Sequence, residues 1–267
     1  MAQRVSVCIP TYDGSVPVPL AGALLAETRI ADRVGIDLDF KFLSGCTNLA
    51  LGRNQLVREF LESDAERLMF VDADVTFEMG ALARLVSYPE LFVGGCYRFK
   101  REEEAYPIAW LENLPELRAN VNGLLQVRML PTGFLSLHRD VFTRFRAHYG
   151  DDRIYEKEKG TYAFFEIPLK NSMLYTEDAY FCQLWHDMGG EMWLAPEITL
   201  THWNGNIPFV GHIGNFLKRR AGLPTLAELG ADALLTKGDS HGKEAGSRIP
   251  EVDVSPREGS QDLQKLG

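Results

Sequence analysis

Two aspartates separated by one small residue, Asp72 and Asp74, directly follow an apolar run from Leu68 to Val71. Paired carboxylate oxygens suit Mg²⁺ or Mn²⁺, ions that also keep phosphate groups in their coordination shell. If the chain stays extended there, both side chains point to the same side, because side chains alternate along a strand. Since Asp is common in turns, two solvated aspartates that open a loop are the alternative interpretation.

The apolar run before the aspartates is typical of a strand buried on both faces, as in a parallel sheet between helices. Earlier runs at 5–9 and 38–42 also predict strands, and helices are expected at 19–31 and 49–62. The order strand, helix, strand, helix, strand builds a parallel α/β sheet. Ligands bind at the carboxyl ends of such strands, which is where the two aspartates are expected.

The rest of the chain continues to alternate between the two element types. Helices are expected at 79–87, 139–149 and 176–186, and strands at 91–97, 108–110, 124–129, 131–137, 162–167, 192–195 and 198–201. Thr176 is the expected N-cap of its helix, with Glu177 and Asp178 in the first turn. Acidic residues there also suit the helix dipole, which alone would explain them. The charged run 98–104 predicts a solvated loop or a mobile flap.

Composition restricts the class of protein. The 267 residues are 45% hydrophobic and 24% charged, which is ordinary for a soluble globular chain. The net charge of -9 argues against a surface built for nonspecific nucleic-acid binding. The four cysteines lack metal-site spacing and are expected to be reduced thiols. Because neither a membrane span nor a secretory signal is recognisable, a cytoplasmic protein is expected.

Several motifs, in this order along the chain, resemble a GT-A fold nucleotide-sugar-dependent glycosyltransferase of the family-2 type. They are Cys8-Ile-Pro-Thr-Tyr12 after the first strand, Arg53-Asn54 on the second helix, Asp72-Ala-Asp74, Thr176-Glu-Asp178, and His202 after a late strand. The similarity spans about residues 5–215. It implies a Rossmann-like, mostly parallel sheet flanked by helices in one domain, expected at 1–216. A helical extension at 217–236, with a capping box at Thr225-Leu-Ala-Glu228, and a disordered tail at 237–267 would follow.

The resemblance also implies roles for individual residues. The nucleotide-sugar donor would contact Pro10, Thr11, Tyr12, Asp13, Arg53, Asn54, Asp72, Ala73 and Asp74. Mn²⁺ or Mg²⁺ would be held by Asp72, Asp74 and His202, with His212 as the rival histidine. Asp178 would be the general base and Glu177 its acidic neighbour. The acceptor side would include Gly133, Phe134 and Trp203.

These roles imply transfer of a sugar from a nucleotide diphosphate, with a UDP-sugar and inversion at the anomeric carbon favoured. The acceptor would be a hydroxyl group of a glycan, a lipid-linked glycan or another molecule, and the acidic charge disfavours nucleic acid. Two alternatives remain open. Asp72-x-Asp74-x-Thr76 also fits the first motif of haloacid-dehalogenase-like phosphatases, with Asp72 as nucleophile, and the chain could be a noncatalytic nucleotide- or glycan-binding module.

Overall fold

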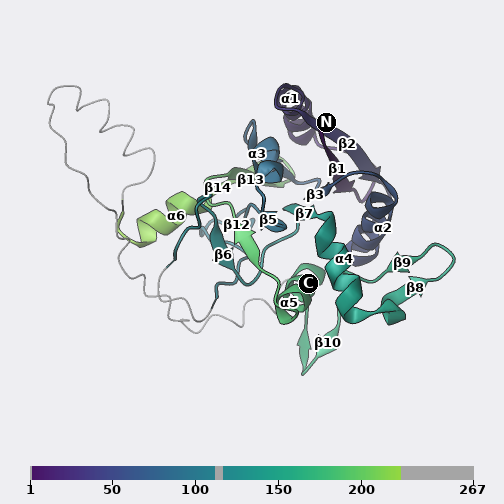
Figure 1. Cartoon of the computed structure of the whole chain (residues 1–267). Helices are drawn as coiled ribbons and strands as arrows, with labels where there is room; N and C mark the ends of the chain where they lie inside the picture. The colour runs from purple at the N-terminus through teal and green to yellow at the C-terminus, as the bar shows by residue number, and fades with distance from the viewer. Residues whose placement is uncertain (1, 112–116, 224–267) are drawn as a thin grey trace, which may run out of the picture.

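The computed structural model describes residues 2–111 and 117–223. Its centre is a seven-stranded sheet (Figure 1). From edge to edge the strands are β2 (Ile36–Leu43), β1 (Gln3–Pro10), β3 (Arg67–Val71), β7 (Phe134–His138), β5 (Phe92–Gly94), β12 (Met192–Leu194) and β6 (Leu125–Val127). Only β7 and β6 run against the other five. The expected mostly parallel sheet is therefore confirmed.

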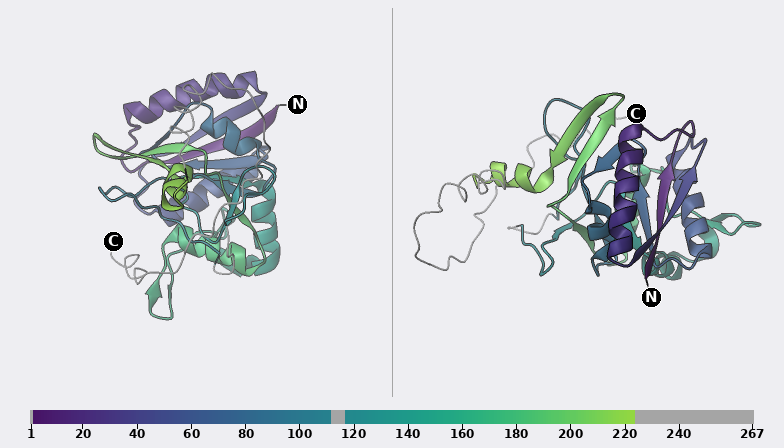
Figure 2. Two further views of the ribbon diagram at one scale, coloured as in Figure 1. Left: turned by 90° about the vertical axis from the view of Figure 1, so that its left-hand side faces the viewer. Right: turned by 90° about the horizontal axis from the view of Figure 1, so that it is seen from above.

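Helices cover both faces of this sheet (Figure 2). One face carries α1 (Val18–Arg33) and α3 (Ala81–Ser87), and the other carries α2 (Leu49–Glu62), α4 (Arg139–Tyr149) and α5 (Glu177–Asp187). The alternation of side chains along β3 explains the two covered faces. Met69 packs with the α1 and α3 residues, whereas Leu68 and Phe70 pack with those of α2, α4 and α5.

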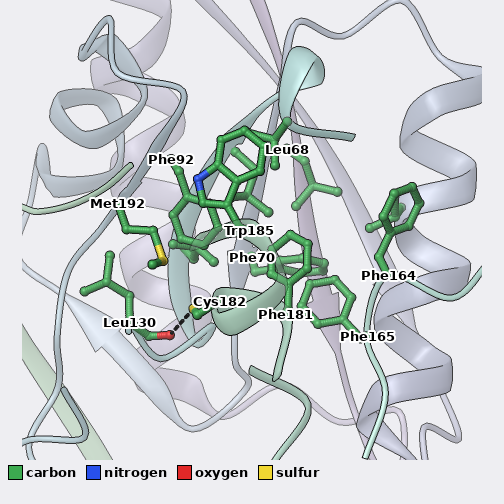
Figure 3. Close-up of a cluster of buried hydrophobic side chains, with 14 of the residues drawn as sticks. Leu68, Phe70, Phe92, Leu130, Phe164, Phe165, Phe181, Cys182, Trp185 and Met192 are labelled. Carbon is green, nitrogen blue, oxygen red and sulfur yellow. Dashed lines mark hydrogen bonds between the residues drawn. The ribbon is translucent and has the colours of Figure 1, made fainter. Parts of the chain in front are cut away.

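The larger core lies between the sheet and α5 and is rich in aromatic rings (Figure 3). Phe181 of α5 packs against Phe165 with ring centroids 4.4 Å apart, and Phe92 of β5 stacks on Phe181 at 5.7 Å. The Cys182 thiol donates to the carbonyl of Leu130 at 3.5 Å. These contacts fix α5 on the sheet, and with it the acidic residues at the start of the helix.

A second, three-stranded sheet lies beside the main one and consists of β4 (Val75–Phe77), β13 (Thr199–Asn204) and β14 (Ile207–His212). The strand β14 leads into α6 (Ile213–Arg220). The remaining elements are η1 (Asp151–Arg153) and two hairpins, β8 (Ile154–Glu156) with β9 (Thr161–Tyr162), and β10 (Leu169–Lys170) with β11 (Met173–Leu174). Because β4 pairs with β13, the chain after Asp72–Asp74 meets the strand that carries His202.

Most expected elements occur, with shifted ends. The helices α2 and α4 have the expected bounds, whereas the strand expected at 91–97 is limited to β5. The strand expected at 108–110 is a single bridge from Ala109 to Met129. The expected domain boundary at 216 falls inside α6. Nearly all of the extension at 217–236, with its capping box, and all of the tail at 237–267 lie outside the described residues.

The four cysteines are free thiols in the structure, and three of them are buried, as expected. Among the described residues, no helix is long and apolar enough to cross a membrane.

Candidate functional site

The chain turns after β3 instead of staying extended. The Asp72 N–H donates to the Gly133 carbonyl at 3.0 Å, and the Val75 N–H donates back to the Asp72 carbonyl at 3.0 Å. The condition under which both carboxylates were expected on one side, an extended chain, is therefore not met, and the two carboxylates have different partners. Ala73 lies between them in the turn.

Arg53 on α2 links Asp72 to the acidic start of α5. Its guanidinium Nη2 lies 3.0 Å from Oδ1 of Asp72, and its Nε lies 3.5 Å from Oε1 of Glu177. The Arg53 side chain is only 1% exposed and stacks over Phe70 with its Cζ 5.2 Å from the ring centroid. Burial opposes the charge, but Asp72 and Glu177 outweigh it and raise the pKa of Arg53. A permanent cation therefore lies buried between two carboxylates.

The carboxylates at the start of α5 have distinct environments. Burial, followed by the charge of Asp178, raises the pKa of Glu177, and Arg53 acts in the opposite direction. Oδ1 of Asp178 accepts from the N–H of Ala179 at 2.8 Å and from the hydroxyl of Thr176. Thr176 occupies the expected N-cap position, but its hydroxyl bonds Asp178 and makes no capping bond to the helix backbone.

Tyr97 and Gly133 close the space beside Asp72. A Cβ atom on Gly133 would lie 2.7 Å from Oδ2 of Asp72 and 2.7 Å from Cε1 of Tyr97, so only glycine fits there. Burial and the charges of Asp72 and Asp178 raise the pKa of the Tyr97 hydroxyl well above its ordinary value. The Tyr97 phenol therefore stays protonated and can donate a hydrogen bond beside the carboxylates of Asp72 and Asp178.

Asp74 faces His202 and Lys100. Its Oδ2 lies 3.5 Å from Nε2 of His202 and accepts a hydrogen bond from the Lys100 ammonium. Burial opposes ionisation, but the neighbouring His202 and the Lys100 ammonium lower the pKa of Asp74 to about 2. Asp74 is thus a carboxylate at neutral pH. Nδ1 of His202 contacts the Arg98 carbonyl at 3.0 Å, and the ring packs on Tyr97 with centroids 4.6 Å apart.

The donor set of Asp74 and His202 fits a divalent cation that completes its shell with water and phosphate. Oδ2 of Asp74 and Nε2 of His202 are 3.5 Å apart, so both would be within reach of one such ion. The second imidazole nitrogen bonds a backbone carbonyl, as it commonly does in metal-ligating histidines. Among the described residues, no cluster of three or more His, Cys, Asp or Glu side chains is placed to hold a metal. Asp72 pairs with Arg53 instead of joining Asp74 and His202.

A cavity of ≈ 280 Å³ lies at the end of β2 and the start of α2. Ser44, Cys46, Asn48, Gln55 and Tyr155 are among its lining residues. The Cys46 N–H donates to the Thr11 carbonyl at 2.9 Å, which connects the cavity to the segment after β1.

In the segment after β1, Thr11 is buried and its hydroxyl donates to the Leu43 carbonyl at 3.2 Å, whereas Tyr12 is 75% exposed. Pro10 is buried as the last residue of β1, and Asp13 accepts from Ser15.

Two expected site residues belong to the framework. Asn54 is buried, and both ends of its amide bond the backbone: Nδ2 donates to the Phe165 carbonyl, and Oδ1 accepts from the N–H groups of Phe164 and Phe165. The Phe134 ring is fully buried and packs on Phe77 with centroids 5.0 Å apart. Asn54 therefore anchors the aromatic segment, and the Phe134 ring belongs to the core. The sequence placed Asn54 on a helix and Phe134 on a strand, but it could not show whether their side chains face a ligand or the protein interior.

The remaining candidates lie on β13 and β14. Trp203 follows His202 directly. Its N–H donates to the Asp74 carbonyl at 2.8 Å, and its indole Nε1 donates to the Thr76 hydroxyl at 2.9 Å. His212 caps α6 by accepting from the Asn215 N–H at 3.1 Å. Of the two histidines, His202 is therefore the one that the structure brings to Asp74.

Lys100, which contacts Asp74, is a residue of the site that the sequence motifs did not indicate. The only sequence signal was the charged run 98–104, which contains several exposed charges and does not identify one of them.

No protein-family model matches the sequence, and no curated protein matches it. Solved structures do match, and glycosyltransferases are among them. A197 from STIV is 18% identical, with a TM-score of 0.49 over 76% of this chain and 86% of that chain. GalNAc-T7 with UDP, GalNAc and Mn²⁺ is 10% identical, with a TM-score of 0.45 over 75% of this chain and 44% of that chain.

TarS residues 1–349 from S. aureus are 15% identical, with a TM-score of 0.40 over 72% of this chain and 57% of that chain. This chain thus spans less than two thirds of GalNAc-T7 and of the TarS fragment. At these identities and TM-scores the likeness carries no argument about activity, which has to come from the residues of this chain.

Proposed function

We propose that this chain is a metal-dependent glycosyltransferase that moves a sugar from a nucleotide diphosphate to an acceptor hydroxyl. The observation that carries the proposal is the position of Arg53, which contacts Asp72 at 3.0 Å and Glu177 at 3.5 Å. One buried guanidinium thereby joins the carboxylates at the end of β3 to the acidic start of α5. This link supports the proposal because it holds Asp72, a proposed donor contact, near Glu177, the neighbour of the proposed base Asp178, and group transfer requires such positioning.

The nucleotide part of the donor is proposed to bind at the carboxyl ends of β1 and β2. The exposed ring of Tyr12 offers a surface for a base, and Asp13 is also exposed. The neighbouring cavity offers hydroxyl and amide groups from Ser44, Asn48 and Gln55. Nucleotides commonly bind at this edge of an open α/β sheet. UDP is the favoured nucleotide because of the family resemblance of the motifs.

Mn²⁺ or Mg²⁺ is proposed to be held by Asp74 and His202, with Asp72 next to the ribose and a metal-bound water. Such a metal supplies Lewis-acid stabilisation of the charge that develops on the departing diphosphate. The chain's own contribution is to keep Asp74 ionised at neutral pH and to orient His202 through the Arg98 carbonyl.

Asp178 is proposed to be the general base. As the acceptor oxygen attacks the anomeric carbon, its proton passes to the Asp178 carboxylate. A new C–O bond forms, and the bond to the diphosphate breaks with its electron pair leaving on the phosphate oxygen. Attack from the opposite face inverts the anomeric centre. Glu177, paired with Arg53, is proposed to position the acceptor rather than to take its proton.

The acceptor side is proposed to include Gly133, where the absence of a side chain leaves space beside Asp72 and Tyr97, and Trp203 next to His202. The acceptor class is any sugar or other hydroxyl compound that reaches Asp178, including lipid-linked glycans. Phe134 is not part of this proposal because its ring is in the core.

The phosphatase alternative has less support. Its acidic pair belongs at a strand end, whereas Glu177 and Asp178 occupy the first turn of α5. Its nucleophile would be Asp72, whose carboxylate is held by the buried Arg53.

The experiment is a thermal-shift screen of nucleoside diphosphates with Mn²⁺ or EDTA, followed by incubation with the matching nucleotide sugars. A bound ligand stabilises the folded state in proportion to its occupancy. The proposal predicts a rise in Tm with one diphosphate in Mn²⁺ and release of that diphosphate from its sugar. Release of inorganic phosphate instead would indicate a phosphatase, and binding without turnover in the presence of acceptors would indicate a binding module.

A further inference from the structure

The loop 98–104 contacts both proposed metal ligands. The Lys100 ammonium donates to Oδ2 of Asp74, and the Arg98 carbonyl lies 3.0 Å from Nδ1 of His202. The same Oδ2 of Asp74 lies 3.5 Å from Nε2 of His202. One short segment therefore orients the histidine and supplies a positive charge to the aspartate.

The tautomer of a neutral His202 ring follows from these partners. A carbonyl oxygen only accepts hydrogen bonds, so Nδ1 of His202 carries the proton toward Arg98. In the neutral imidazole, Nε2 then presents its lone pair toward the Asp74 carboxylate. Two electron-pair donors that face each other across 3.5 Å are stabilised by a cation next to both. In this structure the positive charge beside Asp74 is the Lys100 ammonium.

The loop that presents Lys100 has its own anchors. The Phe99 N–H donates to the Ala105 carbonyl at 2.9 Å, which closes the loop. The Arg98 guanidinium donates to the carbonyls of Arg101 and Glu102, each at 2.7 Å. Glu104 pairs with Arg219 of α6, which ties the loop to that helix.

The Lys100 side chain is 30% exposed and holds Asp74 at the end of a flexible four-carbon stem. It can therefore leave Asp74 without breaking the backbone contacts of the loop.

We propose that Lys100 and a divalent cation are alternative occupants of the Asp74–His202 pair, so that arrival of the cation releases the Lys100 ammonium. The inference rests on the metal site of the proposed function. It adds that the metal has to displace the Lys100 ammonium from Asp74. Without metal, Lys100 neutralises Asp74. With metal, two positive charges beside one carboxylate repel, and the ammonium withdraws toward solvent or toward an anionic phosphate.

The first test measures Mn²⁺ binding without nucleotide, from the electron paramagnetic resonance signal of free Mn²⁺. Lys100→Met removes the competing charge but keeps much of the side-chain volume, and is expected to tighten Mn²⁺ binding about fivefold to tenfold. Arg101→Met is the matched control, because Arg101 lies in the same loop and its guanidinium stacks over Phe99 at 5.0 Å. Its Mn²⁺ affinity should equal that of the unmodified protein.

The second test measures how fast an amine-reactive reagent modifies Lys100, by mass spectrometry of the intact fold. Mn²⁺ should accelerate modification of Lys100 severalfold and leave Lys159 unchanged, since Lys159 pairs with Glu156 on another hairpin. Equal Mn²⁺ affinity in Lys100→Met and the unmodified protein, or a Lys100 reactivity that Mn²⁺ does not change, would overturn the inference.

Neither test uses a nucleotide sugar, so failure of the inference about Lys100 can be told apart from failure of the proposed sugar transfer. Release of Lys100 by Mn²⁺ without any sugar turnover would keep the inference and reject the function. Absence of Mn²⁺ binding in both proteins would overturn the inference. Binding of UDP in EDTA that is lost in Lys100→Met would then identify Lys100 as the permanent counter-charge.

Discussion

The Asp74 carboxylate and the His202 imidazole lie 3.5 Å apart although they are distant in the sequence. Strand pairing brings them together, because His202 of β13 is opposite Val75 of β4. The hydrogen bond from the Trp203 N–H to the Asp74 carbonyl, at 2.8 Å, extends this pairing into the turn. The position of the metal ligands thus depends on the second sheet as much as on β3.

Removal of the Asp74 carboxylate or the His202 imidazole should therefore weaken nucleotide binding mainly when a divalent metal is present. Asp74→Ala and His202→Ala are each expected to reduce UDP affinity in Mn²⁺ far more than in EDTA, as measured by calorimetry. His212→Ala is the matched control, since His212 caps α6. An unchanged affinity in His202→Ala with a loss in His212→Ala would transfer the ligand role to His212.

Arg53 should be essential for stability. Arg53→Ala leaves the carboxylates of Asp72 and Glu177 in a mostly buried site without their shared cation, which typically costs about 3–5 kcal/mol. Arg84→Ala on α3 is the control. Arg84 is 42% exposed and its partner Glu78 is 37% exposed, so a loss of only about 1 kcal/mol or less is expected. Urea denaturation in EDTA measures both, and equal losses would contradict the structural role of Arg53.

Gly133 should tolerate no side chain. Gly133→Ala places a Cβ atom 2.7 Å from both Asp72 and Tyr97, and overpacking of this kind costs about 1–3 kcal/mol. Gly22→Ala is the control, because no atom lies within 4 Å of its added Cβ and alanine favours a helix. We expect a lower Tm and lower donor affinity for Gly133→Ala, and an unchanged or higher Tm for Gly22→Ala. Wild-type values for Gly133→Ala would show that the space beside Asp72 is not restricted.

The acid limb of the stability curve should reflect Asp74. Its pKa is lowered from 3.8 to about 2, so the folded state favours the ionised carboxylate. The stabilisation is therefore fully present above about pH 4 and is lost as the pH falls toward 2. In EDTA, the Tm difference between wild type and Asp74→Asn should shrink as the pH falls from 5 to 3, which calorimetry or circular dichroism can follow. A constant difference would contradict the lowered pKa.

Local patterns predicted the elements that depend on local contacts. The bounds of α2 and α4 follow from helical periodicity, and the β3 strand follows from its apolar run. A strand was predicted at 131–137, but its antiparallel direction and its place between β3 and β5 were not, because strand order depends on pairing between distant segments. The turn after Asp72 corresponds to the alternative interpretation of aspartates that open a loop, since a short Asp-x-Asp segment fits both extended and turn conformations.

The same distinction applies to the site. The motif order indicated the carboxylates, Arg53 and His202, but not which of them contact each other. Periodicity could not tell that Asn54 faces the backbone of Phe164 and Phe165, because a polar residue on a helix fits both surface and core contacts. Lys100 was one of several charges in a loop, and only its contact with Asp74 distinguishes it.

The most direct test of the account is turnover of the nucleotide sugar by Asp178→Asn. The substitution keeps the size of the side chain and an oxygen that can accept from Ala179, but it removes the proton acceptor. Donor binding in Mn²⁺ should persist, because Asp72, Asp74 and His202 are unchanged. Release of nucleoside diphosphate in the presence of acceptor should fall by roughly 10² to 10⁴, the usual contribution of a positioned base. Glu177→Gln is the matched neighbour and should lose less. Turnover by Asp178→Asn at the wild-type rate would contradict Asp178 as the base, and would favour a retaining reaction in which the leaving phosphate takes the acceptor proton.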